Sequence, residues 1–232
     1  MATGNDLLTI AAPHVGEEYI LGALAPKNNA NWGGPWDCAE FVSWCVFQAG
    51  GMLYGCHSNS APPASADAYT GYWRRDAGAL GKKISIDEAA RTPGAALLRV
   101  PSPGANGHIV LCDGHGGTIE AMSPSQRVRR HVVTGRRWDM GILVPGITYE
   151  VNQGGNIGEP PTVYRLTSPF MRGEKVREIQ QALKDAGVDP GSIDGIFGPK
   201  TKAAALGFQL AKGLVADGEV GPETAGALGI EL

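Results

Sequence analysis

Residues 36–51 read Trp36-Asp37-Cys38-Ala39-Glu40-Phe41-Val42-Ser43-Trp44-Cys45-Val46-Phe47-Gln48-Ala49-Gly50-Gly51. The stretch predicts one helix with both ends marked. Asp37 is a capping residue, Glu40 follows three positions later as in a capping box, and the glycine pair ends the helix. Cys38 lies in the first turn, where the helix dipole favours a thiolate. Because the carboxylates of Asp37 and Glu40 disfavour a thiolate, a nucleophile here needs a histidine partner.

A histidine and a carboxylate occur together in a predicted β-hairpin. His108 begins the apolar run 108–112, and Glu120 lies in the following run 118–122. If the hairpin loop has an odd number of residues, His108 and Glu120 lie on the same face of the sheet. They are directly opposite each other if the loop is 113–115, and diagonal neighbours if it is 113–117. An even loop would separate them. Since a thiol, an imidazole and a carboxylate can act as nucleophile, base and orienting group, we predict that Cys38, His108 and Glu120 are catalytic.

The remaining cysteines suggest neither a metal site nor a disulfide scaffold. Cys45 and Cys112 fit the description of small buried hydrophobes. A zinc site made from Cys56-His57 and the Cys112…His115 pair lacks the usual ligand spacing, so we predict no metal and no organic cofactor. Four cysteines are too few to staple a chain of 232 residues.

Composition excludes several classes of protein. The net charge is −3, from 20 basic and 23 acidic residues, which gives no reason to expect nucleic acid as a partner. No apolar run approaches the roughly 18 residues that a membrane span needs. The stretch 1–13 lacks the basic and long apolar regions of a secretory signal, so we expect a protein made in the cytoplasm without a classical signal peptide.

The composition changes after about residue 145. Residues 146–166 are rich in Gly, Pro and Asn and read as a linker between domains at 1–145 and 167–232. In the second domain the octet at 194–201, Asp-Gly-Ile-Phe-Gly-Pro-Lys-Thr, recurs at 217–224 as Asp-Gly-Glu-Val-Gly-Pro-Glu-Thr. Each copy has an Asp-Gly turn and a proline placed to open a helix. With the periodic stretch 173–186, this predicts three helices, the last two reaching about residues 212 and 228.

The spacing of apolar, Gly and Gln positions from Val176 to Leu228 resembles the small peptidoglycan-binding domain found on cell-wall hydrolases. The positions that carry this likeness include Gln180, Asp194-Gly195, Gln209 and Asp217-Gly218. The resemblance implies a module that holds an enzyme on the wall polymer.

A second resemblance covers roughly residues 8–145. Gly16 to Gly22, Asp37-Cys38, Pro93-Gly94, Gly107-His108-Ile109-Val110 and Ile119-Glu120-Ala121 resemble the NlpC family of papain-like cell-wall cysteine peptidases. The resemblance implies that Cys38 is the nucleophile, His108 the base and Glu120 the orienting residue, with Tyr19 beside the site. The chain departs from the family at Ala39, Glu40 and Ala95, and its Glu120 is reminiscent of the related CHAP family.

Substrate contacts are predicted at four residues. Tyr19 is placed by the resemblance, and Trp36 and Asp37 directly precede the nucleophile. Five arginines lie within 126–137. One interpretation is that these arginines are solvated side chains of an edge strand, where charge discourages pairing with other strands. The alternative is that Arg129 binds carboxylates of stem peptides through paired hydrogen bonds.

Together these observations predict an α+β, papain-like domain, with N-terminal helices packed on an antiparallel sheet, followed by a small three-helix peptidoglycan-binding domain. We expect a monomeric peptidoglycan hydrolase that cuts an amide bond of the stem peptide. The expected bond is γ-D-Glu–diamino acid (D,L-endopeptidase); the alternatives are N-acetylmuramoyl-L-alanine amidase or cross-bridge peptidase.

Two other classes of function stay open, a non-catalytic wall-binding protein and an acyltransferase on the same scaffold. The expected place of action is the periplasm or cell wall, reached by a secretion system or by lysis. The enzyme would then serve as a phage-type lysin or as an injected antibacterial toxin with an immunity protein.

Overall fold

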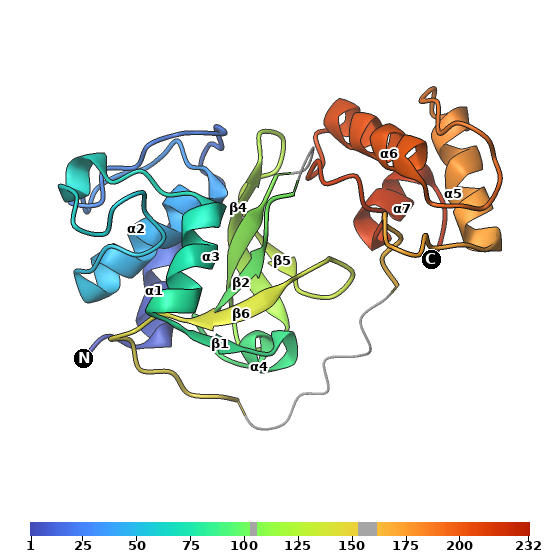
Figure 1. Ribbon diagram of the computed structural model, residues 1–232. Helices are drawn as coiled ribbons and strands as arrows, with labels where there is room; N and C mark the ends of the chain where they lie inside the picture. Colours follow the sequence, from blue (N-terminus) through green and yellow to red (C-terminus); the bar gives the residue numbers. More distant parts are fainter. Residues whose placement is uncertain (103–105, 153–161) are drawn as a thin grey trace. The chain divides into compact units, whose positions relative to one another are not determined.

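The computed structural model describes residues 1–102, 106–152 and 162–232. The chain divides into two compact units, the first formed by residues 1–102, 107–133 and 138–158, the second by 103–106, 134–137 and 159–232. The elements of the first unit are α1 (Gly4–Ala11), η1 (Ala12–His14), α2 (Cys38–Gly50), η2 (Pro63–Ser65), α3 (Thr70–Ala79), β1 (Lys82–Ile84), α4 (Ile86–Ala90), β2 (Ala96–Arg99), β3 (His108–Cys112), β4 (Gly117–Ser123), β5 (Arg127–Val132) and β6 (Met140–Leu143). Those of the second are α5 (Glu174–Asp185), α6 (Pro199–Lys212) and α7 (Pro222–Leu228) (Figure 1).

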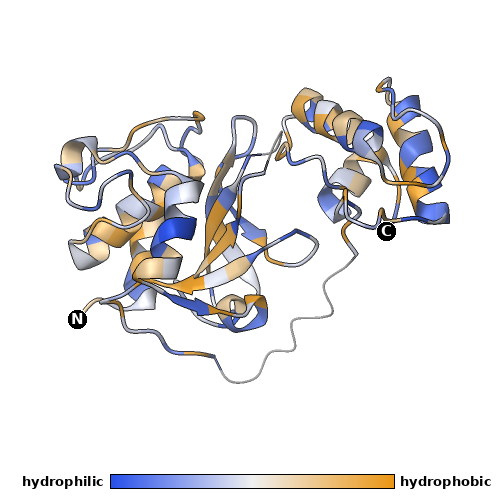
Figure 2. Cartoon of the chain, in the orientation of Figure 1, coloured by the Kyte–Doolittle hydropathy of each residue, from blue (hydrophilic) through white to orange (hydrophobic). Residues whose placement is uncertain are grey.

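The first unit is built on one six-stranded sheet with the order β1-β6-β2-β3-β4-β5, in which every neighbouring pair is antiparallel. All five residues of β3 are buried. A strand covered on both faces is apolar throughout instead of alternating, which is why 108–112 is a continuous apolar run. Figure 2 shows this apolar character along the central strands.

The two faces of the sheet carry different cores. On one face, α1 and α2 pack through Leu7, Phe41 and Val42 onto strand residues that include Ile109 and Leu111. On the other, the alanines of α4 pack with Val110, Cys112 and Trp138. Because side chains alternate along a strand, β3 serves both cores.

The N-terminal helix is fixed by a close approach between two glycines. A Cβ on Gly94 would lie 2.2 Å from the backbone oxygen of Gly4, and Gly94 has a left-handed φ of 75°. Only glycine allows this approach, so the Pro93-Gly94 turn is needed to seat α1 on the unit.

The outer edge of β5 is partly covered by the segment that precedes Tyr19. Gly16 donates its N–H to Val128 O (2.8 Å), and Val128 donates to Glu17 O (3.0 Å). Arg127, which is not a glycine, has a positive φ of 58°, and its guanidinium donates to Gly16 O (3.1 Å). This pairing fixes the start of the chain segment that leads to Tyr19.

The second unit has a core of its own, formed by Val176, Ile179 and Leu183 of α5 with apolar residues of α6, α7 and the turns between them. The three helices end where the sequence predicts, with α6 reaching Lys212 and α7 reaching Leu228. Each of these two begins with the proline of one repeat copy, because proline fixes a helical φ and needs no N–H acceptor there.

The repeat also builds two equivalent polar clusters. Gln180 Nε2 donates to Asp194 Oδ1 (3.0 Å), Ile196 O (3.1 Å) and Thr201 Oγ1 (3.1 Å), while its Oε1 accepts from Gly195 N (2.9 Å).

Gln209 makes the corresponding bonds one repeat later, to Asp217 Oδ1 (2.8 Å), Glu219 O (2.8 Å) and Thr224 Oγ1 (3.0 Å), and accepts from Gly218 N (2.8 Å). The repeated Asp-Gly and Thr positions therefore secure the turns.

The predicted architecture is confirmed: N-terminal helices lie on an antiparallel sheet, and three helices form the C-terminal part. The boundaries at 145 and 166 stay a prediction, and the predicted linker at 146–166 lies partly outside the described residues.

Candidate active site

Helix α2 carries Cys38 as its first residue, as predicted. Asp37 caps it, its Oδ1 accepting from Glu40 N (2.8 Å) and its Oδ2 from Gly22 N (3.2 Å). Gly51 ends the helix with a left-handed φ of 66°. Cys38 therefore stands at the end of the helix where backbone N–H groups lack acceptors within the helix.

Glu40 does not complete a capping box, and that expectation is wrong. Its side chain is fully buried, accepts from Ala25 N (2.9 Å) and Ala68 N (2.5 Å), and forms an ion pair with the equally buried Lys27. Lys27 Nζ also donates to Ala25 O (3.0 Å) and Ala66 O (2.8 Å). The pair ties two loops to the first turn of α2, next to Cys38.

The surroundings of Cys38 favour the protonated thiol. Burial raises the pKa of the thiol to about 12, and the negative charge of Asp37 contributes in the same direction. The backbone N–H groups of Ile109 and Ala39 and the charge of Arg99 act against this rise. The helix start alone does not favour a thiolate here, so the predicted role of Cys38 as nucleophile depends on a base.

His108 and Glu120 form a buried pair on one face of the sheet. The register Cys112↔Thr118 makes the hairpin loop 113–117, and this odd loop gives the predicted diagonal arrangement. His108 Nε2 lies 2.6 Å from Glu120 Oε2. Thr118 Oγ1 donates to the other carboxylate oxygen at 2.6 Å. Glu120 thus holds the imidazole through Nε2. The second ring nitrogen of His108 is Nδ1.

The backbone of Ile109 relates Cys38 to this pair. Strands β3 and β4 are paired at Leu111↔Ile119 and Cys112↔Thr118 but not toward His108. Cys112 N donates to Ala95 O on the β2 side, so by alternation the N–H of Ile109 points to the β4 side. This N–H group is close enough to the Cys38 sulfur to lower the pKa of the thiol. The sulfur therefore lies beside the residue that follows His108, where the strands separate.

Three further residues border the site and were not predicted from the sequence. Thr118 shares the face of Glu120 two positions away, a signal that strand alternation could have supplied. Trp138 stacks on the imidazole of His108, with ring centroids 6.1 Å apart and an interplanar angle of 28°. Arg99 is opposite His108 in the register and is buried. No local pattern marks Trp138 or Arg99.

Tyr19 and Asp37 are close to Cys38. Burial raises the pKa of Tyr19 well above its ordinary value, and the charges of Cys38 and Asp37 add to this rise. Burial also raises the pKa of Asp37 to about 6. Asp37 is 8% exposed and already bonded to two backbone N–H groups, so its first task is to hold the helix start.

Trp36, predicted as a substrate contact, lies in the core of the N-terminal unit. It has no exposed surface, its Nε1 donates to Glu17 Oε2 (2.6 Å), and its ring packs edge-on against Phe41 and Trp44. A side chain with no exposed surface cannot touch a ligand in this conformation. Trp36 therefore supports the site from within the core.

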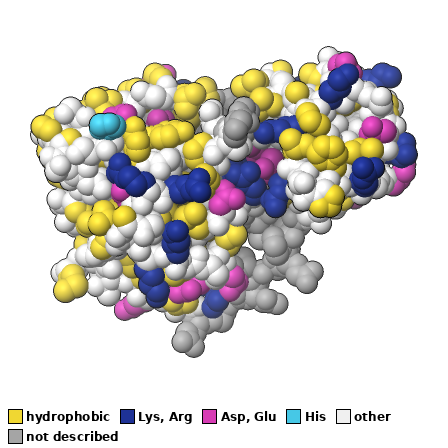
Figure 3. All heavy atoms as spheres, viewed as in Figure 1, with side chains coloured by type: hydrophobic (Ala, Val, Ile, Leu, Met, Phe, Trp, Pro, Cys, Tyr) yellow, Lys and Arg dark blue, Asp and Glu magenta, His cyan; other side chains and the backbone are white. Residues whose placement is uncertain are grey.

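Arg129 is paired with Glu120 in the register and is half-buried. Its guanidinium donates to the side chain of Gln126 and to Arg130 O (3.3 Å). β5 is an edge strand of the sheet, which agrees with the solvated-edge interpretation of the arginines. Figure 3 shows basic and acidic side chains interspersed on the visible face.

Among the described residues, no group of three or more His, Cys, Asp or Glu side chains could hold a metal ion. All four cysteines are buried thiols. In the ranges that the structure covers, none of the helices combines the length and apolar character that a bilayer crossing requires.

Comparison with known proteins supports the resemblance of the C-terminal part to a peptidoglycan-binding domain. Residues 172–228 match the family model described as a putative peptidoglycan binding domain, which covers α5, α6 and α7. An N-acetylmuramoyl-L-alanine amidase of Bacillus licheniformis is 45% identical over 71 residues, 28% of this chain and 20% of that protein. A zinc D-Ala-D-Ala carboxypeptidase of Streptomyces albus G is 53% identical over 57 residues, 22% of this chain and 21% of that protein.

The chain spans about a fifth of the length of these curated relatives. Among solved structures, the chain is similar to the NlpC/p60 domain of the peptidoglycan hydrolase SagA. The identity is 22% and the TM-score 0.43, over 61% of this chain and 99% of that one.

Proposed function

We propose that the protein is a peptidoglycan hydrolase of the NlpC kind, a cysteine peptidase or amidase that cuts an amide bond of the stem peptide. The observation that carries the proposal is the buried His108–Glu120 pair, 2.6 Å between Nε2 and Oε2, at the strand end where Cys38 approaches Ile109. A buried imidazole held by a carboxylate beside a helix-start thiol fits nucleophilic acyl transfer.

In this mechanism the side chains act in sequence. Nδ1 of His108 takes the proton of Cys38, and the sulfur attacks the amide carbonyl carbon. The backbone N–H of Cys38 stabilises the resulting oxyanion. His108 then donates its proton to the leaving amine, and water hydrolyses the thioester. Glu120, oriented by Thr118, stabilises the imidazolium throughout.

For the bond, we propose γ-D-Glu–diamino acid, which makes the enzyme a D,L-endopeptidase. The second candidate is the N-acetylmuramoyl-L-alanine bond, favoured by the activity in the name of the Bacillus licheniformis relative. The two cuts release different fragments: the first frees a new amine on the diamino acid, the second frees intact stem peptides from the glycan.

The test is mass spectrometry of fragments released from purified sacculi by the full chain. We expect dipeptide ends on the glycan and new diamino-acid amines, and release of whole stem peptides would replace the endopeptidase by the amidase. Cys38→Ala should abolish release. Cys45→Ala, a buried cysteine of the same helix, is the matched control and should retain it. Persistent release by Cys38→Ala would remove Cys38 from the mechanism.

The C-terminal unit, with proposed boundaries 167–232, would hold the enzyme on peptidoglycan, and its family match supports this role. The proposed place of action is accordingly the periplasm or cell wall. Delivery by a secretion machine would call for an immunity protein that blocks the site, whereas release by lysis would not. Inhibition by the product of a small neighbouring gene would favour delivery as a toxin.

A further inference from the structure

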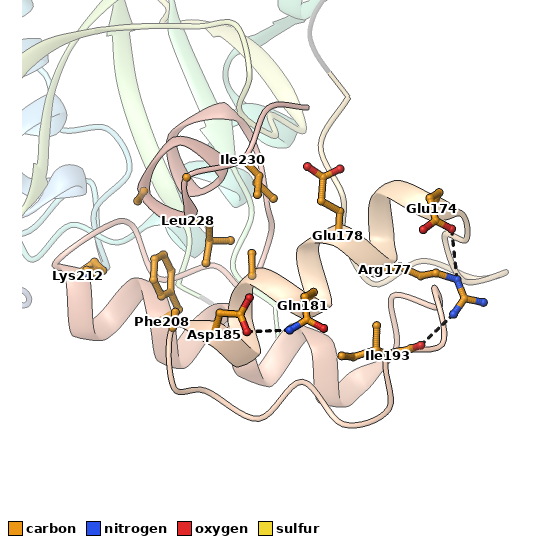
Figure 4. A pocket seen from close by; sticks show the side chains of 14 residues that line it. Glu174, Arg177, Glu178, Gln181, Asp185, Ile193, Phe208, Lys212, Leu228 and Ile230 are labelled. Atoms are coloured by element: carbon orange, nitrogen blue, oxygen red, sulfur yellow. Dashed lines mark hydrogen bonds and ion pairs between the residues drawn. The ribbon is translucent and has the colours of Figure 1, made fainter.

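A groove of about 900 Å³ lies within the C-terminal unit, between α5 and the ends of α6 and α7 (Figure 4). Phe208, Leu228 and Ile230 form its apolar wall. Leu228 and Ile230 are only partly buried, although they pack against the core of the unit. The groove therefore offers hydrocarbon surface that the fold itself does not cover.

The opposite wall is polar and belongs to α5. Glu178, Gln181 and Asp185 follow one another at spacings of three and four, which places them on one face of the helix. In Figure 4, Glu178 and Asp185 leave α5 on the side where Leu228 and Ile230 lie. The groove thus combines an apolar wall with carboxylates, and the cation Arg177, which also borders it, is bonded to Glu174 and to Ile193 O.

These polar side chains are not needed for the fold. The bonds that secure the turns are made by the buried Gln180 and Gln209. Glu178 pairs with Lys175 (2.6 Å) and Asp185 accepts from Gln181 (2.8 Å), both on the surface of one helix. Surface pairs of this kind contribute little to stability, so a ligand can replace them at little cost.

The chemistry of the walls selects one component of peptidoglycan. Sugar rings bind to exposed aromatic faces, but Phe208, the aromatic residue of this groove, is 2% exposed, and Lys212 Nζ stands 5.9 Å from its ring centroid. A hydrocarbon chain that ends in an ammonium group matches both walls, with its methylenes on Leu228 and Ile230 and its charge near Glu178 and Asp185.

We propose that this groove binds the stem peptide of peptidoglycan through the uncrosslinked amine of its diamino acid. The inference rests on the proposed role of the unit in holding peptidoglycan, and it names the part of the polymer that is held. The glycan strand is the competing ligand that the test must separate from it.

Binding of the full chain carrying Cys38→Ala to purified sacculi provides the measurement, because this variant leaves the polymer intact. Gln181→Lys adds a cation to the polar wall and should weaken binding about three- to tenfold through like-charge repulsion. Leu210→Lys adds the same charge to α6 at a residue that is 65% exposed and outside the groove, and should bind normally. Equal binding by both variants would overturn the site, provided that both keep their helical circular dichroism.

Two chemically altered polymers identify the ligand. Acetylation of sacculi with acetic anhydride removes the charge of the diamino-acid amines and should reduce binding to the level of Gln181→Lys. Glycan stripped of its peptides by an amidase should not bind. Unchanged binding to either polymer would overturn the inference while leaving the unit a peptidoglycan binder. Failure to bind untreated sacculi would instead overturn the proposed role of the whole unit.

Discussion

Gln180 in the C-terminal unit and His108 in the N-terminal unit are both buried polar residues that contact a carboxylate, yet they serve different purposes. Gln180 is a neutral amide whose donors and acceptor all bond to nearby turns, and the arrangement is repeated at Gln209. His108 can gain and lose a proton, and it faces a carboxylate beside a thiol. Burial with saturated neutral bonds therefore indicates structure, and burial of a titratable pair next to a nucleophile indicates chemistry.

Substitution of Glu120 is the strongest test of this contrast between a structural and a chemical role. Glu120→Gln keeps the shape but removes the charge that stabilises the imidazolium, so we expect hydrolysis of sacculi to fall about 10²–10⁴-fold. Stability should change much less. The assay is the rate of amine release. If activity falls by less than threefold, the pair has a structural role like that of Gln180.

Substitutions of Thr118 test the same pair through a smaller change. Thr118→Val removes one hydrogen bond to Glu120, and Thr118→Ser keeps it. A loss of activity of about 10- to 100-fold in the Val variant, with recovery in the Ser variant, is expected because a hydrogen bond to a charged group contributes about 1.5–3 kcal/mol.

Lys27 tests a buried ionic pair to which the proposed mechanism gives no catalytic role. Lys27→Met leaves the Glu40 carboxylate buried without its cation, and we expect a loss of about 3–5 kcal/mol in the free energy of unfolding. All five tryptophans lie in the N-terminal unit, so unfolding followed by tryptophan fluorescence reports this unit alone.

The pH dependence of Lys27→Met provides its control. Without the cation, the pKa of Glu40 rises further, and the folded state binds a proton that the unfolded state has lost. Stability of the variant must therefore fall as the pH rises from about 4 to 7. A flat profile would mean that Glu40 is not buried with Lys27.

Gln180→Leu should destabilise the C-terminal unit by about 2–3 kcal/mol, because the N–H of Gly195 and the hydroxyl of Thr201 lose a buried partner. Far-ultraviolet circular dichroism should show earlier loss of helix, whereas tryptophan fluorescence should not change. Gln209→Leu is the matched variant in the second repeat copy. A fluorescence change as large as the dichroism change would show that the two units do not unfold separately.

The smallest effect is expected at Asp37. Burial raises its pKa to about 6, so between pH of about 4 and 6 the folded state holds a proton that the unfolded state releases, and stability falls as the pH rises. Asn keeps a cap but does not titrate. The stability of Asp37→Asn relative to wild type should therefore improve by about 1–2 kcal/mol from pH 4 to pH 7, measured by urea unfolding. A constant difference would contradict the burial of this carboxylate.

Local patterns predicted much of this molecule. The limits of α2 follow from Asp37 and Gly51, the shared face of His108 and Glu120 follows from loop parity, and α6 and α7 follow from the repeated Gly-Pro. In each case the signal lies within a few residues of the feature that it determines.

Features that depend on distant residues escaped prediction. Lys27 meets Glu40 through a loop, and Trp138 reaches His108 from a segment that precedes β6. Trp36 lies two residues before Cys38 in sequence but points into the core, where its indole donates to Glu17. Tertiary packing decides such placements, and no spacing along the chain encodes it.

The most direct test of the central claim, that His108 acts on Cys38, is the rate at which iodoacetamide alkylates Cys38, followed by peptide mass spectrometry across a range of pH. In the wild type the imidazole should accept the thiol proton and allow alkylation near pH 7–8. In His108→Gln, alkylation at pH 8 should be at least about 100-fold slower, because burial raises the pKa of the thiol and no imidazole is left to accept its proton. Equal rates in the two proteins would show that residue 108 does not reach the sulfur, and the proposed mechanism would fail.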